Sequence, residues 1–586
     1  MLLLGVCSSI ACSAVVDIGL DGSWEFAFVE DTPLERAYDE DAQAGGFAVT
    51  ATMPVPGCFD AMPDFLRKRG TGLYRRTFRL ERDTPDALVR VEGMGLRCAV
   101  SIDGRPLSAD LSATNFVSAL PYSTVTFGLN QSLPLSAGPH LITAAVDNMF
   151  DAVRQPLFLP YYDFYAFGGF YHGVSLRCLE TSSDIERIYV RTVDFRKGRV
   201  SLELDFLNAW GVAADPNVTL PVSVDGRPIG DVSFKDGRAE ITVPRPTLWS
   251  PEHPMMHTVT VKGCTERFGI RQIEARGKRL FLNGEPLYLK GVNRHESHPE
   301  FGAATPEVVM ARDLQLVRRL GGNFVRGAHY PQCRRFLDLC DEMGVLVWEE
   351  ALGWGNTPAQ MQDGRFIAAN VEQTELMVRN SFNHPSVIIF GFLNENDSSS
   401  PAGKALVERL VDVVRGFDSG RLVTYACNRT GNDIANEKTD IIAFNAYPGW
   451  IGSDAGSPAN LKRLVREEVD RTVKYFRSRY GDKPIIVSEM GTCGVYGQRD
   501  VAAAQWTEEF QAEYLADETE VVFANEEICG FTVWQFCDAP SYLRGGASVR
   551  VKPFAVNLAG LFDGYRRPKL AAGAIERAFK SSETQR

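Results

Sequence analysis

Two segments of the chain lead an apolar run directly into a glutamate. Residues 387–392 read VIIFGF and precede Asn394 and Glu395, and residues 484–487 read PIIV and precede Ser488 and Glu489. Such runs are typical of strands buried on both faces of a parallel sheet. Two carboxylates at the ends of such strands can share one reaction, because one can donate a proton while the other attacks or stabilises an electron-poor carbon. The pattern therefore predicts a two-carboxylate site.

Eight apolar segments after about residue 275 are the strands that would position these side chains. They read LYLKGVNRH, GGNFVRGAHYP, GVLVWEEALGW, SVIIFGFLNE, RLVTYAC, DIIAFNAYPGW, KPIIVSEMG and CGFTVWQFCD. Helical patterns lie between them, for example at residues 305–320, where Thr305 is the expected N-cap and Pro306 the first helical residue, and at 457–481. Eight such units indicate a (β/α)₈ barrel, whose chemistry lies at the carboxyl ends of its strands.

The first half of the chain has a different pattern. Short alternating runs between turn signals predict an antiparallel, jelly-roll-like β-sandwich at residues 16–180 and an immunoglobulin-like β-sandwich at 181–272. The (β/α)₈ TIM barrel then takes residues 273–586. We therefore expect a multidomain β plus α/β fold, which suits a chain of 586 residues, too long for one core.

Most of the expected barrel strands end in polar or aromatic residues. These are Arg294, His295, Arg326, His329, Tyr330, Glu349, Glu350, Asn394, Glu395, Asn445, Tyr447, Glu489, Trp534 and Asp538. A purely structural barrel has no need of such a ring, so the pattern indicates an active site. Strands four and seven lie across the bore from each other, and their glutamates are expected about 5 Å apart, the separation for glycoside hydrolysis with retention of configuration.

Four barrel motifs resemble those of glycoside hydrolase family 2, which holds β-galactosidases, β-glucuronidases and β-mannosidases. They are LYLKGVNRHESHPEFG, GGNFVRGAHYP followed by FLDLCDEMGVLVWEE, NHPSVIIFGFLNEN and KPIIVSEMGT. The resemblance extends over nearly the whole chain, because the family's usual order is sandwich, immunoglobulin-like domain, barrel.

The resemblance implies roles for individual residues. Glu395 corresponds to the acid/base, Glu489 to the nucleophile, and Asn394 to the amide that binds the sugar 2-hydroxyl. Tyr447 corresponds to a tyrosine that touches the nucleophile and Arg326 to an arginine that orients it. The remaining implied substrate-binding residues are His295, His329 and Trp534 in the sugar pocket and Asp163 in YYDFYAFGGFYHGVSL, which would bind sugar hydroxyls. We therefore expect a retaining exo-β-glycosidase that removes terminal, non-reducing β-linked sugars.

The sugar class depends on a motif near the end of the barrel. Family glucuronidases carry Asn-x-Lys there to bind the substrate carboxylate, whereas this chain keeps Asn557 but has Ala559 in place of the lysine. Arg544, Arg550 or Lys552 would be a substitute cation. Because a galactosidase needs no such cation, and GVNRHESHPEFG resembles the galactosidase version of that motif, we expect a β-galactosidase-type enzyme first, acting on a galactoside, a galactofuranoside or another neutral sugar. A β-uronidase acting on glucuronides or galacturonides comes second, and a mannosidase third.

A carbohydrate-binding protein on an inactive hydrolase scaffold is the alternative from another functional class. The presence of both glutamates together with Asn394 and Tyr447 argues against it. We expect a carbohydrate as the partner and no organic cofactor; a homo-oligomer stays open.

Composition argues against several other functions. The net charge of −12 disfavours nucleic acid as a partner. The 12 cysteines contain no CxxC pair, and His295, His298 and His329 show no HxxxH or HxH spacing, so we expect no metal site, although some β-galactosidases of the family use magnesium.

The N-terminus, MLLLGVCSSIACSAVV, is uncharged before Asp17 and ends in small residues. It resembles the apolar region and cleavage site of a secretory signal, although the basic n-region is missing. We therefore expect residues 1–15 to be a signal peptide and the protein to be periplasmic or extracellular, with a cytoplasmic location as the alternative. No other stretch is expected to cross a membrane.

Overall fold

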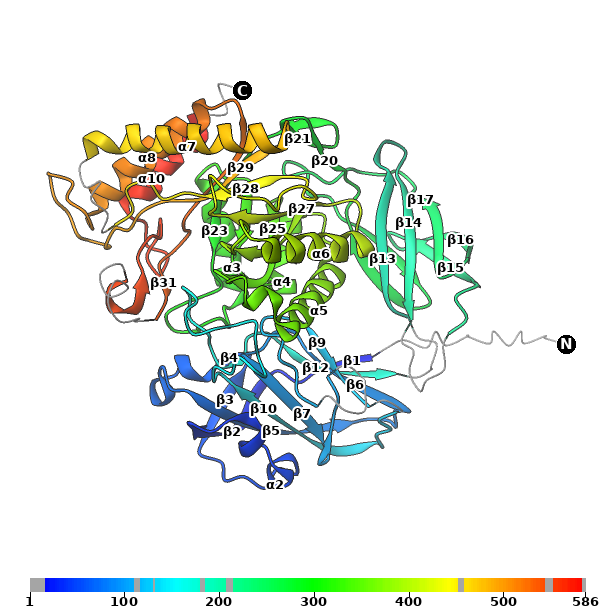
Figure 1. Ribbon diagram of the computed structural model, residues 1–586. Helices are drawn as coiled ribbons and strands as arrows, with labels where there is room; N and C mark the ends of the chain where they lie inside the picture. The colour runs from blue at the N-terminus through cyan, green and yellow to red at the C-terminus, as the bar shows by residue number, and fades with distance from the viewer. Residues whose placement is uncertain are drawn as a thin grey trace.

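The computed structural model describes residues 16–109, 116–129, 132–179, 185–206, 214–451, 458–542 and 552–581. The expected signal peptide, residues 1–15, lies outside them, as do Arg544 and Arg550. Two β-sandwiches lie against a barrel that occupies the second half of the chain (Figure 1). The expected fold class is confirmed.

The N-terminal sandwich consists of two antiparallel sheets. One has the order β1 (Val16–Gly19), β12 (Val174–Leu179), β6 (Asp86–Val91), β9 (Val125–Phe127). The other has the order β3 (Ala51–Val55), β2 (Gly22–Glu30), β5 (Gly70–Leu80), β10 (Gly138–Asp147), β7 (Arg97–Ile102), β8 (Arg105–Pro106). A two-stranded ribbon, β4 (Gly57–Cys58) with β11 (Gly169–Phe170), and two short helices, α1 (Leu34–Ala37) and α2 (Glu40–Gln43), complete it.

Within the described residues, the second sandwich has seven strands, the number found in a constant-type immunoglobulin domain. One sheet has the order β13 (Ile185–Asp194), β14 (Arg199–Phe206), β17 (Arg238–Thr242). The other has the order β16 (Arg227–Phe234), β15 (Val218–Val224), β18 (His257–Val261), β19 (Cys264–Phe268). Asp225 and Gly226, which join β15 to β16, have φ values of 50° and 71°. Positive φ at both central residues of a two-residue loop matches the twist of the strands it connects, and Asp-Gly is a preferred pair there.

A small sheet leads into the barrel and covers one end of it. Its strands are β20 (Ile273–Arg276), β21 (Arg279–Leu282) and β22 (Glu285–Leu287). Ile273 and Leu280 join the buried cluster of Leu289 and Phe324, which lie at the amino ends of two barrel strands. This apolar plug leaves the opposite, carboxyl end of the barrel for chemistry.

All eight expected barrel strands are present and form a closed parallel barrel. They are β23 (Leu289–Arg294), β24 (Phe324–Gly327), β25 (Leu346–Trp354), β26 (Val387–Asn394), β27 (Leu422–Cys427), β28 (Ile442–Asn445), β29 (Ile485–Met490) and β30 (Ile528–Val533). The surrounding helices are α3 (Glu307–Arg319), α4 (Arg334–Met343), α5 (Gly364–Ser381), α6 (Pro401–Phe417), α7 (Pro458–Tyr480), α8 (Glu508–Ala524) and α10 (Leu570–Ser581).

The first barrel helix, α3, begins at Glu307, one residue later than the expected start at Pro306. Pro306 is the N-cap of α3, with an extended ψ of 151°, and Thr305 does not cap the helix. A residue before proline is driven away from helical geometry, so Thr305 lies outside the helix, and its buried Oγ1 has no hydrogen-bond partner within the described ranges.

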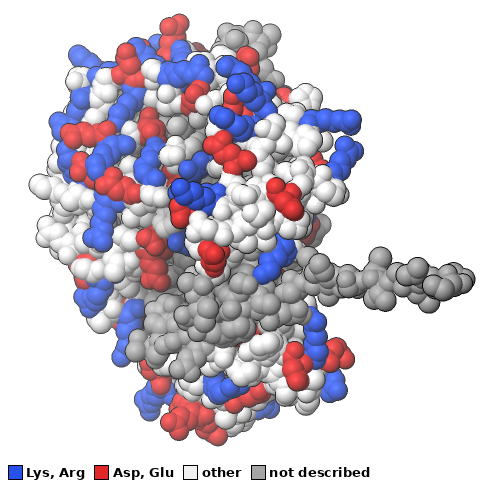
Figure 2. Space-filling view, turned by 90° about the vertical axis from the view of Figure 1, so that its right-hand side faces the viewer, with Lys and Arg blue, Asp and Glu red and all other residues white. Residues whose placement is uncertain are grey.

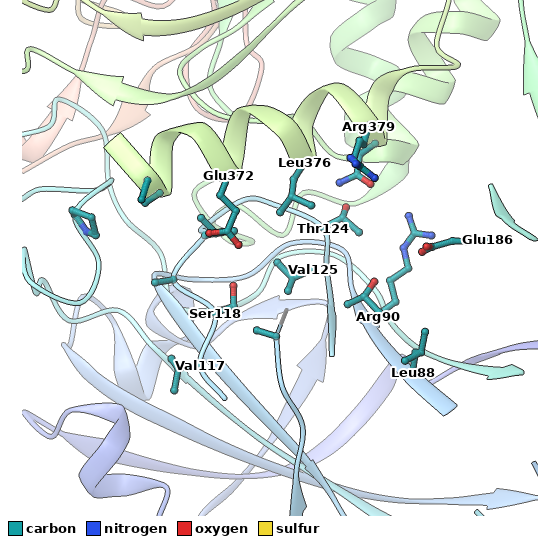
Figure 3. Close-up of a pocket in the computed structure, with 18 of the residues that line it drawn as sticks. Leu88, Arg90, Val117, Ser118, Thr124, Val125, Glu186, Glu372, Leu376 and Arg379 are labelled. Atoms are coloured by element: carbon teal, nitrogen blue, oxygen red, sulfur yellow. The ribbon is translucent and has the colours of Figure 1, made fainter. Parts of the chain in front are cut away.

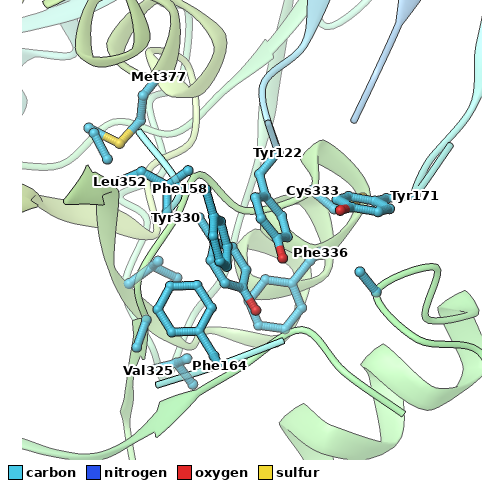
Figure 4. Close-up of a cluster of buried hydrophobic side chains, with 14 of the residues drawn as sticks. Tyr122, Phe158, Phe164, Tyr171, Val325, Tyr330, Cys333, Phe336, Leu352 and Met377 are labelled. Atoms are coloured by element: carbon cyan, nitrogen blue, oxygen red, sulfur yellow. The ribbon is translucent and has the colours of Figure 1, made fainter. Parts of the chain in front are cut away.

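Aromatic side chains join the N-terminal sandwich to the barrel. Tyr122 from the sandwich stacks on Tyr330, which follows β24, with ring centroids 3.8 Å apart and planes inclined by 12° (Figure 4). Phe164, from a sandwich loop, packs against the same Tyr330 ring at 5.6 Å. The sandwich thus brings the loop that contains Asp163 to the carboxyl end of the barrel.

The surface carries charges of both signs. On the face seen in Figure 2, Lys and Arg side chains are interspersed with Asp and Glu. The absence of a nucleic-acid partner stays a prediction. No helix within the described ranges is long and apolar enough to span a bilayer.

Candidate active site

Glu395 and Asn394 lie at the carboxyl end of β26 in an unusual backbone conformation. Leu393 and Glu395 both have a φ of 54°, in the left-handed region that non-glycine residues rarely adopt. Successive side chains of a regular strand point to opposite faces, and the left-handed residues break that alternation. Such conformations cost of order 1–3 kcal/mol each and concentrate at functional sites.

Glu489, near the end of β29, has both carboxylate oxygens fixed by neighbouring side chains. Its Oε1 accepts a hydrogen bond from Arg326 Nη1 at 2.5 Å, and its Oε2 accepts one from Tyr447 Oη at 2.5 Å. These two contacts fix the orientation of the carboxylate, and they are the contacts that the family resemblance implies for Arg326 and Tyr447.

Arg326 connects most of the site. Its guanidinium donates to both carboxylate oxygens of Glu350 at 3.0 Å and to the side-chain oxygens of Asn394 and Asn293 at 2.9 Å. Glu350 is therefore the member of the Glu349–Glu350 pair that faces this network, which the sequence left undecided. Asn293 was missed, because nothing in the sequence pattern of β23 indicates that its side chain meets Arg326.

The environments of the two glutamates differ. Glu395 accepts a hydrogen bond from Asn445 Nδ2 at 2.9 Å, whereas Glu489 contacts a guanidinium. Burial, together with the negative charge of Glu489, raises the pKa of Glu395 to about 7. Glu395 is thus able to hold a proton near neutral pH and release it, which is the requirement for a general acid/base.

Three rings form a wall beside the glutamates. Trp534 stacks on His329 with centroids 5.3 Å apart, and His295 lies edge-on to Trp534 at 5.5 Å. Burial, with the charge of Arg326 acting in the same direction, lowers the pKa of His329 to about 3. Burial also lowers the pKa of His295 well below its usual value. Both imidazoles are therefore neutral.

Two buried polar atoms in this network have no hydrogen-bond partner among the described residues, namely Asn394 Nδ2 and His329 Nε2. Buried polar groups are normally satisfied. A polar ligand in the site would satisfy both atoms, and the family resemblance implies that Asn394 binds a sugar 2-hydroxyl.

Asp163 and Asn557 have partners that the sequence did not predict. Asp163 Oδ2 forms an ion pair with Lys552 Nζ. Asn557, in β32 (Val556–Asn557), accepts a hydrogen bond from Ala559 N at 3.1 Å. Burial lowers the pKa of Lys552 to about 7, so its ammonium depends on a neighbouring anion to stay charged.

A cavity of about 670 Å³ lies elsewhere, between the N-terminal sandwich, the immunoglobulin-like domain and α5 (Figure 3). Arg90, Glu186, Glu372 and Arg379 are among its lining residues, and neither Glu395 nor Glu489 is. Because this cavity contains neither glutamate, we do not assign the reaction to it. The candidate active site is the network of side chains at the carboxyl ends of the barrel strands.

Comparison with known proteins agrees with this geometry. A model of the TIM barrel domain of the glycosyl hydrolases of family 2 matches residues 273–581. The chain is 27% identical to the β-glucuronidase of Rattus norvegicus over 600 residues, which cover 94% of this chain and 89% of that protein. Mus musculus β-glucuronidase is 26% identical, with the same two coverages.

A solved structure shows the same overall fold. The β-galacturonidase from Eisenbergiella tayi, bound to galacturonate, superposes with a TM-score of 0.82 at 26% identity and covers 97% of both chains. Since the family model matches more than half of the chain and the fold agrees throughout, the chain belongs to glycoside hydrolase family 2 and is a glycoside hydrolase.

Proposed function

We propose that this enzyme is a retaining, exo-acting β-uronidase, which hydrolyses a terminal β-linked glucuronic or galacturonic acid. The observation that carries the proposal is the buried Lys552 ammonium at the mouth of the barrel. The proposal reverses the order expected from the sequence, where the loss of the Asn-x-Lys lysine at Ala559 favoured a neutral galactoside.

The proposed reaction has two displacements at the anomeric carbon. In the first, a Glu489 oxygen attacks that carbon while the bond to the leaving-group oxygen breaks, and Glu395 transfers its proton to the leaving group. In the second, the Glu395 carboxylate takes a proton from water, whose oxygen attacks the same carbon and releases Glu489. Glu395 regains its proton, and the sugar keeps its β configuration.

The position of Lys552 supports its proposed role as the carboxylate-binding cation. Its partner Asp163 is next in sequence to Phe164, whose ring lies 5.0 Å from His295 and 5.6 Å from His329. The Lys552 side chain is only 8% exposed. A uronate carboxylate bound in the sugar pocket would share this ammonium with Asp163 or replace Asp163 as its partner.

The relatives support the same sugar class. Proteins that are more than 25% identical to this chain in sequence include β-glucuronidases and a β-galacturonidase. Either uronic acid presents one carboxylate on C5, so the same cation would serve both.

The test is a panel of aryl β-glycosides that includes glucuronide, galacturonide, galactoside, galactofuranoside, glucoside and mannoside. A uronide is expected to have the highest kcat/KM. A galactoside as the best substrate would overturn the proposal and restore the first expectation from the sequence.

Lys552→Met tests the cation directly while it keeps most of the apolar stem. A hydrogen bond to a charged group contributes roughly 1.5–3 kcal/mol, so we expect a fall of about 10–150-fold in kcat/KM for the uronide. Hydrolysis of a neutral galactoside should change far less. Lys404→Met is the control, because Lys404 lies on α6 and pairs with Glu437. An equal loss on both substrates would show that Lys552 does not recognise the carboxylate.

A further inference from the structure

A second group of reactive side chains lies where the N-terminal sandwich meets the barrel. His172 comes from the turn between β11 and β12, Glu296 follows β23, and Cys333 immediately precedes α4. One nitrogen, one oxygen and the sulfur of these residues all lie within 4.8 Å of one another. The three residues are buried, with exposed fractions of 7%, 1% and 6%.

His172 contacts both Glu296 and Cys333, but one carboxylate oxygen of the cluster has no partner among the described residues. His172 Nε2 lies 3.1 Å from Glu296 Oε2, but Glu296 Oε1 has no hydrogen-bond partner among the described residues. Leaving a buried carboxylate oxygen without a partner is costly. The backbone of Glu296 is held in place, because its N–H donates to Tyr330 Oη at 2.8 Å. A group that binds carboxylate oxygen is therefore expected beside it.

We propose that His172, Glu296 and Cys333 form a Zn²⁺ site that joins the N-terminal sandwich to the barrel. Imidazole nitrogen, carboxylate oxygen and thiolate sulfur are the ligand atoms that zinc accepts, whereas a thiolate is a poor ligand for Mg²⁺ or Ca²⁺. The thiolate and the carboxylate together balance the charge of the ion.

The spacing is close to that of a bound site. Zinc bonds of 2.0–2.3 Å in a tetrahedron place ligand atoms about 3.5 Å apart. Separations of up to 4.8 Å therefore require the side chains to close by about 1 Å, within reach of small rotations of χ angles. Cys333 and Tyr171 belong to the same buried cluster and line the same pocket.

The cluster also has an approach from solvent. His172, Cys333 and Thr305 line an open pocket of about 580 Å³, through which an ion and a water molecule can enter. Three protein ligands with one position left for water is a common zinc arrangement.

A second cluster shows what changes when both carboxylate oxygens have hydrogen-bond partners. Asp338, Asp341 and His384 also bring ligand atoms within 4.8 Å. There, however, Asp341 accepts hydrogen bonds on both oxygens, from His384 Nδ1 at 2.6 Å and from Ser386 N at 3.0 Å. The hydrogen bonds that Asp341 accepts account for the close approach of these side chains, so we propose no zinc site there.

The test measures metal binding by the full chain. Protein dialysed against EDTA is titrated with Zn²⁺ in competition with a chromophoric chelator, and its metal content is measured by mass spectrometry after gel filtration. We expect one Zn²⁺ per wild-type chain, and a Tm that rises with Zn²⁺ because the ion binds only the folded state. Cys333→Ser and His172→Ala should lose both effects. Cys340→Ser, which changes a buried thiol in α4 outside the cluster, should keep them.

Co²⁺ in place of Zn²⁺ gives a result that does not depend on the variants folding. Ligation by Cys333 predicts an intense thiolate-to-cobalt charge-transfer band in the wild-type protein, together with the visible bands of a tetrahedral ion. A wild-type protein that binds no Zn²⁺, or that binds Co²⁺ without the sulfur band, overturns the proposal. So does a folded Cys333→Ser variant with unchanged Zn²⁺ affinity.

Discussion

Glu395 and Glu489 are the same residue type, and their surroundings give them different chemistry. Arg326 and Tyr447 hold Glu489 by both oxygens, whereas Glu395 accepts a hydrogen bond from the neutral amide of Asn445. In the proposed mechanism, the carboxylate next to the guanidinium attacks and the carboxylate next to the amide carries the proton. The sequence predicted both residues as the catalytic pair from their positions at strand ends, and the structure shows how their hydrogen-bond partners differ.

The loss of kcat/KM in Glu395→Gln should depend on the leaving group of the substrate. General acid catalysis contributes about 10²–10⁴-fold, so kcat/KM for a substrate with a poor leaving group, such as a methyl glycoside, should fall by that amount. An aryl glycoside with a strongly acidic phenol needs little protonation to depart, and its first displacement should be much less affected. Steady-state and burst kinetics on the two substrates measure the difference, and equal losses on both would contradict the acid/base assignment.

The pH profile follows from the raised pKa of Glu395. Its carboxyl group is protonated below its pKa of about 7 and loses the proton as pH rises through it. The first displacement needs the protonated form, so kcat/KM should fall above about pH 7 with an apparent pKa near that value. In Glu395→Gln, measured on the acidic aryl glycoside, this alkaline limb should disappear. A limb that persists in the variant belongs to another group.

At the scale of elements, the eight barrel strands were predictable because each is a short apolar run and most of them end in polar or aromatic residues. The start of α3 was not, because Pro306 with a ψ of 151° takes the N-cap position that Thr305 was expected to fill. Pairings between distant segments were also beyond the sequence. Lys552 was one of three candidate cations, and only the fold brings it to Asp163. The approach of His172, Glu296 and Cys333 has no counterpart in local spacing, which is why no metal site was expected.

Substitution of Asp313, on α3, tests how this helix is held to the barrel. It accepts hydrogen bonds from Arg294 Nε at 3.0 Å and Arg566 Nε at 2.9 Å, and neither it nor Arg294 is exposed. Asp313→Ala leaves two buried guanidinium groups without this carboxylate, so we expect a loss of about 3–5 kcal/mol in the free energy of unfolding. Chemical denaturation measures it.

Asp412→Ala is the matched control. Its carboxylate pairs with Lys438 at 2.7 Å, but the Asp412 side chain is 63% exposed. An exposed ion pair contributes about 0–1 kcal/mol. If Asp313→Ala were no more destabilising than this control, the buried pairs around α3 would not be what anchors the helix.

At the scale of the whole molecule, the N-terminal sandwich reaches the candidate active site. Asp163 and Phe164 come from the sandwich and meet Lys552 and the barrel histidines. Arg69, also from the sandwich, donates to Tyr542 Oη at 2.8 Å in the segment that follows the last barrel strand. One apolar core runs through both domains, from Leu20 to Phe579. Sandwich and barrel are therefore expected to unfold together.

Tyr122→Ala tests this coupling at the centre of the junction. Truncation of a large buried aromatic side chain costs about 3–5 kcal/mol, and here it also removes the ring stacked on Tyr330. The Tyr330 hydroxyl accepts the Glu296 N–H and lies 3.4 Å from His295 Nδ1. A looser Tyr330 should therefore lower kcat/KM as well as Tm, although Tyr122 contacts neither glutamate. Tyr122→Phe keeps the stacked ring and should stay close to wild type in both measurements. Calorimetry should show one transition in the wild-type protein and in both variants, because the shared core ties the domains together. Two results would contradict this coupling: a separate transition of the sandwich in the wild-type protein, or normal activity in a destabilised Tyr122→Ala. Either would mean that the sandwich supports the barrel without shaping its active site.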